Sequence, residues 1–356
     1  MGILQLIDSL EAGGAERMAV NYANGLVDRV AFSALVATRK EGPLKTQLHD
    51  GVDYLFLNRK SIFDSKALLL LRNFVKKNQI NIIQAHSSSF LMAILLKLIY
   101  PKIKIVWHDH YGNSEFLKKR KKVLLQIGSL FFYRIIVVNE LLKKWAIENL
   151  FCKKVIYLPN FVLLDENKES IILKGEFGKR ILCLANLRPQ KNHRMLLEVA
   201  KRMKVSHPDW TFHLIGKDFM DQHSSDIHQQ IIKDELENTV FIYGSSDAVA
   251  SAIKQSTIGI LTSLSEGLPV SLLEYGYFGL PVIVTAVGEI PNVINKDNGF
   301  LVPPQDVMIF KKALQQLMEN GDLRNSLGEQ LKKDIHLNYT KETVLKKFFA
   351  VLNNES

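Results

Sequence analysis

The sequence predicts an α/β protein with two doubly wound domains, each a parallel sheet covered by helices on both faces. Three observations lead to this fold class. Short, near-continuous runs of Val, Ile and Leu alternate with longer helical patterns, which is typical of parallel strands buried on both faces. The alternation occurs twice, on either side of a stretch from Asn160 to Lys179 where charge and glycine interrupt it. The length of 356 residues also suits two domains of ordinary size.

The first half of the chain is expected to alternate between strands and helices from its first residues onward. Strands are predicted at Ile3–Ile7, Ala34–Thr38, Tyr54–Leu57, Ile80–Ala85, Ile103–Trp107, Ile135–Asn139 and Val155–Leu158. Amphipathic stretches between them are predicted to be helices, among them Lys66–Lys77, Phe90–Leu98 and Glu140–Asn149.

The second half repeats the pattern. Strands are predicted at Arg180–Ala185, Phe212–Ile215, Val240–Tyr243, Ile258–Thr262 and Val282–Thr285. Helices are predicted at His193–Met203, Asp247–Lys254, Val307–Met318 and Lys341–Leu352. Two sheets of this kind are expected to bind ligand in a cleft where the carboxyl ends of their strands face each other.

The composition is that of an ordinary globular protein, with 47% hydrophobic and 23% charged residues. Cys152 and Cys183 are interpreted as reduced thiols, which favours a cytoplasmic location. The start of the chain lacks the features of a signal peptide. The longest apolar stretch, Val123–Val138, is interrupted by Gln126 and Arg134, so we expect no membrane-spanning helix.

The excess of positive over negative charge lies entirely in the first half of the chain. Residues 1–165 contain 24 Lys and Arg against 13 Asp and Glu, a net charge of +11, whereas residues 166–356 contain 22 against 23. Basic runs such as Lys118–Lys122 are most simply solvated helix faces. A sharper interpretation is attraction to an anionic membrane surface. Nucleic acid is not expected as a partner, because no zinc spacing, helix-turn-helix pattern or aromatic RNA-binding signature accompanies the charge.

The stretch SEGLPVSLLEYGYFGLPVIVT, from Ser265 to Thr285, predicts a turn and a short helix after a buried strand. Pro269 suits the first position of the helix, since its missing N–H costs nothing there. Gly279 suits the C-terminal cap, and Pro281 stops the helix beyond it. The predicted helix therefore runs from about Pro269 to Phe278, and its N-terminus attracts anions at the carboxyl edge of the sheet.

Two glutamates flank this turn. Glu266 lies in the loop and Glu274 lies within the helix. A carboxylate there repels phosphate, so its natural partners are hydroxyl groups, and the combination of amides with carboxylates is typical of a nucleotide-sugar pocket. The spacing alone would favour two solvated glutamates, so this interpretation depends on two further stretches.

The first is CLANLRPQKNH, Cys183 to His193, where a polar turn with Arg188 and Lys191 follows a strand. Cations at that edge would bind phosphates and stabilise a charged leaving group, although an isolated lysine there would be taken for a surface residue. The second is SLEAGGAER, Ser9 to Arg17, where Gly13 and Gly14 allow close approach of backbone to a ligand before a helix that starts at about Ala15. It could equally be a tight strand-to-helix turn.

Histidines follow two strands of the first half: His86 in QAHSSS, and His108 and His110 in WHDHYG. Near a sugar they could donate hydrogen bonds or take a proton, and at least one of them is expected to be structural. His108 and His110 without a third ligand are poor evidence for a metal site. The sequence contains no G-x-S-x-G or other nucleophile motif.

With these stretches assembled, the chain resembles a family-4 retaining glycosyltransferase of the GT-B fold over nearly its whole length. The resemblance rests on GGAE, HDHYG, LPN, LRPQKNH, the Glu-x7-Glu block EGLPVSLLE with its sequel GLPVIVT, and the closing segment PNVINKDNGFLVPPQD. It implies two Rossmann-like domains that face a central cleft. Residues 1–165 would bind the acceptor and residues 166–339 the nucleotide sugar, and a C-terminal helix at about 340–356 would pack back on the first domain.

The resemblance also implies roles for single residues. Glu266 would contact hydroxyls of the donor sugar, helped by backbone amides around Gly267, Leu268 and Val270, and Glu274 would hold the ribose. Lys191 would bind the diphosphate, approached by Gly13 and Gly14 from the other domain. His110, rather than His108, is the preferred residue under the donor sugar. Further candidates for contact with the acceptor or the sugar are Glu16, His86 and His108. The pocket near Gly244 would choose the base.

One position departs from the family pattern. The family usually has arginine five residues before the lysine, where this chain has Asn186. Whether Arg188 replaces it is left open.

The implied reaction is a front-side displacement in which the departing diphosphate helps to deprotonate the acceptor hydroxyl. It needs no protein nucleophile, no cofactor and no metal, and the donor is a UDP- or GDP-sugar. The expected enzyme is a hexosyltransferase that acts on a lipid-linked or growing saccharide in bacterial surface polysaccharide synthesis, at the inner face of the cytoplasmic membrane. The alternatives are a nucleotide-sugar epimerase or hydrolase of the same fold, and a non-catalytic binding protein.

Overall fold

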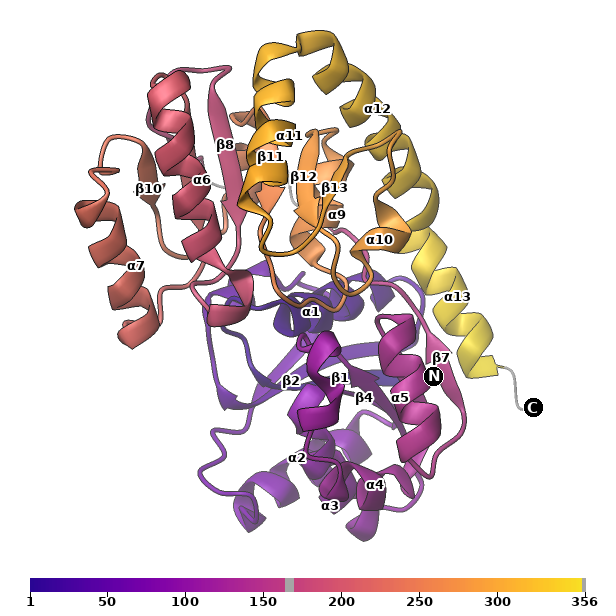
Figure 1. Ribbon diagram of the computed structural model, residues 1–356. Coiled ribbons are helices and arrows are strands. Elements are labelled where there is room, and N and C mark those ends of the chain that lie inside the picture. The colour runs from indigo at the N-terminus through magenta and orange to yellow at the C-terminus, as the bar shows by residue number, and fades with distance from the viewer. Residues whose placement is uncertain (164–169, 354–356) are drawn as a thin grey trace. The chain divides into compact units, whose positions relative to one another are not determined.

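The computed structural model describes residues 1–163 and 170–353 (Figure 1). The chain separates into two compact units, Met1–Leu163 with Lys341–Ser356, and Leu164–Thr340. The boundary expected between residues 165 and 166 lies outside the described residues. Within the part of the chain that is described, we find no helix that is both long and apolar enough to cross a bilayer.

The first unit contains a seven-stranded parallel sheet with the order β3-β2-β1-β4-β5-β6-β7. The strands are β1 (Gly2–Ser9), β2 (Phe32–Lys40), β3 (Asp53–Phe56), β4 (Ile80–His86), β5 (Lys104–Asp109), β6 (Phe132–Val137) and β7 (Val155–Tyr157). The chain adds strands outward from β1 to β3 and then returns to pair β4 with the other side of β1. The carboxyl ends of β1 and β4 therefore form the topological switch point, where such sheets bind ligands.

Helices cover both faces of this sheet. They are α1 (Gly14–Leu26), α2 (Ser65–Lys77), α3 (Phe90–Ile99), α4 (Val123–Ser129), α5 (Glu140–Asn149) and α13 (Lys341–Asn353), with short 3₁₀ turns η1 (Pro43–Gln47), η2 (Ser87–Ser89) and η3 (Ser114–Lys119). One face is an apolar core against α2, α3 and α5. On the other face α1 packs on the strands, and Tyr22 of α1 contacts Phe348 of α13 at a ring-centroid distance of 5.2 Å.

The second unit contains a six-stranded sheet with the order β10-β9-β8-β11-β12-β13, again parallel throughout. Its strands are β8 (Arg180–Leu184), β9 (Thr211–Ile215), β10 (Val240–Ile242), β11 (Ile258–Leu261), β12 (Val282–Thr285) and β13 (Phe300–Val302). The helical elements are η4 (Pro189–Lys191), α6 (His193–Ser206), α7 (Gln222–Lys233), α8 (Val249–Lys254), α9 (Val270–Tyr277), α10 (Ile290–Val293), α11 (Val307–Glu319) and α12 (Gly321–Asn338). Its switch point lies between β8 and β11.

The predicted fold class, two doubly wound parallel α/β sheets, is confirmed. All the predicted strands exist, with ends shifted by a few residues at most, and the apolar stretch Val123–Val138 divides into α4 and β6. The three-residue strand β13 and the helices α7 and α12 were not predicted. The predicted start of α9 at Pro269 was wrong by one residue. Pro269 has an extended ψ of 124° and is the N-cap, and the helix begins at Val270. Gly279, with φ of +73°, follows the C-cap of α9 as expected.

Candidate active site

The switch point of the second unit brings the turn after β8 and the loop after β11 together. The backbone N–H of Leu264 donates to the carbonyl of Gln190 at 2.7 Å, and the hydroxyl of Thr262 donates to the carbonyl of Lys191 at 3.0 Å. These two bonds hold the turn after β8 and the loop after β11 against each other. The backbone that carries Lys191 and Glu266 is therefore fixed in position.

Glu266 and Lys191 form an ion pair across this junction. Lys191 Nζ donates to Glu266 Oε1 at 2.5 Å, and Ser263 Oγ donates to the same oxygen at 2.6 Å. Glu266 is only 5% exposed, so its charge is compensated by a cation and a hydroxyl rather than by bulk water. An ionised carboxylate accepts through both oxygens, which leaves Oε2 with acceptor capacity for a ligand hydroxyl.

The backbone around Glu266 is held by a second loop. Gly288 has φ of +57°, and a Cβ there would lie 2.2 Å from the carbonyl oxygen of Glu266, so only glycine fits. The N–H of Glu289 donates to the carbonyl of Gly267 at 2.9 Å. Leu268 is buried, which anchors the turn that leads into α9.

Glu274 is the second glutamate of the Glu-x7-Glu block. It lies in α9, five residues after the N-cap Pro269, and is 5% exposed. Neither glutamate is therefore a solvated surface residue, which was the alternative interpretation. A buried carboxylate needs specific partners, and this favours a site with a function.

The position of Arg188 differs from that of Lys191. The guanidinium carbon of Arg188 lies 4.7 Å from the ring centroid of Phe219, and Lys217 Nζ lies 5.3 Å from the same ring. Asn186, the residue that departs from the family pattern, accepts a hydrogen bond from the N–H of Lys217 at 2.7 Å. Asn186 therefore ties the β8 turn to the loop after β9. Neither Lys217 nor Phe219 was singled out in the sequence.

Gly244 follows β10 and has φ of +71°. Its carbonyl accepts from the N–H of Gly216 at 2.9 Å, and a Cβ on Gly216 would lie 2.2 Å from the carbonyl oxygen of Ala185. Glycine thus allows the ends of three neighbouring strands to approach closely. A Cβ at Gly244 would meet no atom of the described residues within 4 Å.

Cys183 and His193 lie near the Lys191–Glu266 pair but are unsuited to nucleophilic or acid chemistry. Burial raises the pKa of the Cys183 thiol to about 12, although the charge of Lys191 lowers it and that of Glu266 raises it by smaller amounts. Burial lowers the pKa of His193 to about 4, and neighbouring His223 and Lys191 lower it further. At neutral pH both side chains are uncharged.

In the first unit, polar side chains stack on the face of the sheet that α1 covers. Gln5 of β1 is in register with Gln84 of β4, and His86 of β4 is in register with His108 of β5. These four residues are fully buried, and His110 follows at the end of β5, partly exposed. Tyr22 packs on the group, its ring centroid 5.5 Å from that of His108.

The hydrogen bonds of this group run between neighbouring strands. His86 Nε2 lies 2.8 Å from Gln5 Oε1, and His86 Nδ1 lies 2.9 Å from His110 Nε2. Gln84 Nε2 lies 2.9 Å from His108 Nδ1. The three histidines were predicted as candidate sugar contacts, but their hydrogen bonds to one another and to Gln5 and Gln84 were not predicted. The only available signal was a glutamine in the middle of each of two apolar strands.

His86, His108 and His110 also form a possible metal-ligand set, because one nitrogen from each lies within 4.8 Å of the others. His86 is the third ligand that the sequence argument lacked. The hydrogen bond between His86 and His110 accounts for their proximity without an ion. The expectation of a site without metal stays a prediction.

Asp109 stands between the two histidines of HDHYG and has a different partner. Arg120 donates two parallel hydrogen bonds to it, Nη1 to Oδ2 at 2.7 Å and Nη2 to Oδ1 at 2.8 Å. The guanidinium also lies over the rings of Tyr111 and Trp145, at 4.3 and 4.4 Å. This clamp fixes the end of β5 and therefore the backbone that carries His110.

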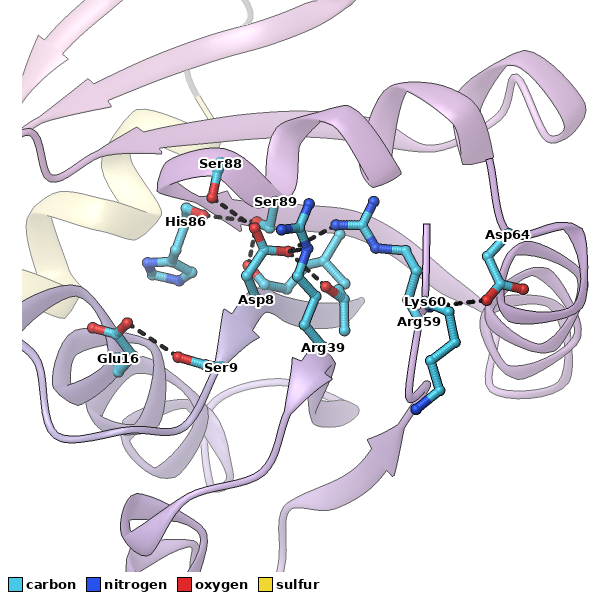
Figure 2. Close-up of polar contacts among 12 residues, drawn as sticks. Asp8, Ser9, Glu16, Arg39, Arg59, Lys60, Asp64, His86, Ser88 and Ser89 are labelled. Atoms are coloured by element: carbon cyan, nitrogen blue, oxygen red, sulfur yellow. Dashed lines mark hydrogen bonds and ion pairs between the residues drawn. The ribbon is translucent and has the colours of Figure 1, made fainter. Parts of the chain in front are cut away.

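Figure 2 shows a second polar cluster of this unit, around Asp8 near the end of β1. Asp8 Oδ1 accepts from Thr38 at 2.6 Å and from Arg59 at 3.2 Å, and Oδ2 accepts from Ser88 at 2.6 Å. Arg39 lies 3.9 Å from the same carboxylate. The side chain of Arg59 is 1% exposed, so Asp8 supplies the counter-charge for a buried cation.

The glycine turn after β1 has two different glycines. A Cβ on Gly13 would overlap the carboxylate of Glu16, which itself accepts from Ser9 Oγ at 3.3 Å. A Cβ on Gly14 would meet no described atom within 4 Å. A side chain at position 13 would only have to displace the flexible end of Glu16, so packing does not require glycine there, and Gly14 borders open space.

Comparison with known proteins gives consistent matches over most of the chain. The family model for "Glycosyl transferases group 1" matches residues 165–334, and the model for "Glycosyltransferase Family 4" matches residues 12–166. Among curated proteins, the Escherichia coli UDP-Gal:alpha-D-GlcNAc-diphosphoundecaprenol alpha-1,3-galactosyltransferase is 27% identical over 86% of this chain and 85% of its own length. The amylovoran biosynthesis glycosyltransferase AmsD of Erwinia amylovora is 25% identical over 99% of both chains.

Among solved structures, Anabaena HepE in complex with UDP and glucose aligns with a TM-score of 0.82. The alignment covers 99% of this chain and 100% of that chain at 17% identity, which establishes similarity of fold.

Proposed function

Because this chain belongs to family 4 of the glycosyltransferases and has their GT-B fold, we propose that it transfers a hexosyl residue from a nucleotide-diphosphate sugar with retention of configuration. The proposed acceptor is a lipid-linked or growing saccharide in the synthesis of a bacterial surface polysaccharide. Two names support this proposal: the Escherichia coli relative is named for transfer to GlcNAc-diphosphoundecaprenol, and the Erwinia amylovora relative is named for amylovoran biosynthesis.

The single observation that carries the proposal is the partly buried Lys191–Glu266 ion pair at the switch point of the second unit. A diphosphate would compete with Glu266 for the ammonium group of Lys191. Glu266 would then keep its bond to Ser263 and accept a hydroxyl of the transferred sugar. Lys191 would compensate the charge that develops on the leaving diphosphate, which is the main electrostatic requirement of the reaction.

Retention is proposed to follow from front-side displacement. In the donor complex Glu266 would be engaged by Ser263 and by a hydroxyl of the sugar, and the Cys183 thiol is protonated, so neither is prepared to attack a sugar carbon. Catalysis would then rest on the positions of donor and acceptor and on the cation at the leaving group.

The proposed donor is a UDP- or GDP-sugar, bound without a metal ion. Glu274 would accept hydrogen bonds from the ribose, and the amides around Gly267, Leu268 and Val270 would serve the sugar and phosphates. The complex of Anabaena HepE with UDP and glucose makes UDP-sugars the first candidates to test.

We also propose that the protein acts at the cytoplasmic face of the membrane, through the surface of α4. Val123, Leu124, Ile127 and Leu130 expose 66%, 65%, 55% and 66% of their surface there. The exposed Lys118, Lys119, Lys121 and Lys122 precede them, whereas Arg120 turns inward to Asp109. Apolar side chains beside a lysine run suit a surface of anionic lipids, each lysine contributing on the order of 1 kcal/mol.

Sedimentation with liposomes tests the membrane surface. Vesicles of phosphatidylglycerol and phosphatidylcholine should retain the protein at low salt and release Leu124→Ser/Ile127→Ser. Val205→Ser is the matched control, because Val205 is 87% exposed but lies on α6 in the other unit. Equal retention of all three proteins would refute the proposed surface.

The transfer reaction is tested by incubating the protein with each nucleotide sugar, with and without a lipid-linked saccharide acceptor. We expect product only with acceptor, and an anomeric carbon with the donor's configuration by NMR. Conversion of donor without acceptor would indicate the epimerase or hydrolase instead. Tight donor binding without any conversion would indicate the binding protein, and an inverted anomeric carbon would refute retention.

A further inference from the structure

The buried polar residues under α1 form hydrogen bonds whose donors and acceptors can be assigned in sequence. Gln5, Gln84, His86 and His108 are each 0% exposed. Polar groups so deeply buried are costly unless they are hydrogen-bonded, so the direction of each bond constrains the protonation of the next residue.

His86 is the central residue of this order. Its Nε2 lies 2.8 Å from Gln5 Oε1, and since an amide oxygen can only accept, Nε2 carries a hydrogen. Burial lowers the pKa of His86 well below its usual value, and neighbouring His110 lowers it further, so the ring is neutral at neutral pH. A neutral imidazole has one N–H, and Nδ1 of His86 is therefore an acceptor.

The same reasoning applies to His110, the next residue in this series of hydrogen bonds. His110 Nε2 lies 2.9 Å from His86 Nδ1 and must donate to it. Burial lowers the pKa of His110 to about 3, so this ring is neutral as well. Its remaining nitrogen, Nδ1, then carries a lone pair, and His110 is the one member of the group that is partly exposed.

We propose that Gln5 and His86 are positioning residues, which hold His110 with its proton on Nε2 so that His110 Nδ1 accepts a hydrogen bond from a sugar hydroxyl. This inference rests on the proposed transfer reaction, because that reaction supplies the hydroxyl. The hydroxyl belongs either to the transferred sugar or to the acceptor saccharide. With the opposite tautomer, His110 would present an N–H to the ligand.

The order of the bonds is tested directly in the ligand-free protein. In ¹⁵N-histidine NMR spectra, His110 should have a protonated Nε2 and an unprotonated Nδ1. Gln5→Met removes the acceptor oxygen at nearly constant size and should give a mixture of His110 tautomers, whereas Gln5→Glu should keep the single tautomer. Gln84→Met is the matched control, because Gln84 lies beside Gln5 in the sheet but contacts His108.

The effect on the reaction is tested with the same variants. Loss of one oriented hydrogen bond should lower kcat/KM about ten-fold in Gln5→Met, and Gln5→Glu should restore it. If the hydroxyl is on the donor, Gln5→Met binds the nucleotide sugar more weakly but the nucleoside diphosphate equally well. If it is on the acceptor, the KM for acceptor rises and both nucleotides bind as before.

The proposal is overturned if wild-type His110 carries its proton on Nδ1, or if Gln5→Met leaves its tautomer unchanged. It is also overturned if the tautomer changes while kcat/KM does not. Because the NMR measurement needs no substrate, failure of the proposed function would not hide the result. An active enzyme with an unchanged tautomer would refute only the positioning role.

Discussion

Lys191 and Glu266 are 75 positions apart in the sequence, and their side chains meet at 2.5 Å beside the switch point of one sheet. Without a ligand these two charges neutralise each other. If Lys191 binds the donor phosphates and Glu266 a sugar hydroxyl, as we propose, donor binding has to break this pair. Removing the charge of Glu266 should then strengthen phosphate binding but slow the transfer reaction.

The variant Glu266→Gln should separate the effect on nucleotide binding from the effect on the rate of transfer. The substitution keeps the shape of the side chain but releases the charge of Lys191, so we expect a nucleoside diphosphate to bind more tightly, by up to about ten-fold. Transfer should fall about 100-fold, because the carboxylate no longer accepts the sugar hydroxyl. Titration calorimetry and initial rates measure the two effects.

Glu198→Gln is the control for that variant, because Glu198 pairs with Arg202 on the exposed face of α6 in the same unit. It should change neither quantity. Weaker binding of the diphosphate to Glu266→Gln would show that Glu266 supports the phosphate site rather than competing for Lys191.

Glu274→Ala tests the assignment of the ribose. Removing a charged acceptor of hydroxyl hydrogen bonds costs about 1.5–3 kcal/mol, so a nucleoside diphosphate should bind at least ten-fold more weakly. Inorganic diphosphate, which has no ribose, should bind as it does to the wild type. Undiminished binding of the nucleotide would contradict the assigned role.

Stability should fall on acidification because the buried histidines are neutral in the folded state. Burial lowers the pKa of His110 to about 3, while the unfolded chain has the usual value of about 6.5. Between these values the unfolded state binds the extra proton, so the free energy of unfolding falls by about 1.4 kcal/mol per pH unit below 6.5 for this one residue.

Hydrogen exchange measured by mass spectrometry at pH 7.0 and 5.5 can follow this effect in peptides from β4 and β5. His110→Gln should reduce the pH dependence in the first unit. His49→Gln should not, because His49 is exposed in the same unit. Equal pH dependence in both variants would contradict the neutral state of His110 in the folded protein.

Asp8 is expected to be essential for the stability of the first unit. Asp8→Ala leaves the buried guanidinium of Arg59 without its counter-charge, and breaking such a pair costs about 3 kcal/mol or more. Urea unfolding measures the change. Glu41→Ala removes the exposed partner of Lys45 and should have little effect, so equal loss in both variants would refute the role of Asp8.

The fold and half of the candidate site could be predicted because they depend on local patterns. Buried parallel strands are apolar throughout, and the residues after them share one edge of the sheet. Lys191 and Glu266 could both be assigned to that edge from their positions after β8 and β11. Their direct pairing, however, depends on the adjacency of these two strands, which skip β9 and β10 in the sheet.

The hydrogen-bonded group under α1 could not be predicted for the same reason. Gln5 and Gln84 are neighbours only because β4 returns to the side of β1, past β2 and β3. Arg188 illustrates another limit, because its contact with Phe219 depends on the conformation of the loop after β9.

The most direct test of the central claim is the thermal stabilisation of the wild type and of Lys191→Ala by a panel of nucleotides and nucleotide sugars, with UDP and GDP forms included. A ligand at 100 times its dissociation constant should add about 2.7 kcal/mol to the free energy of unfolding. We predict that one class of donor stabilises the wild type and that the same donor does not stabilise Lys191→Ala. Stabilisation by no donor, with or without acceptor, or equal stabilisation of both proteins, would contradict this prediction.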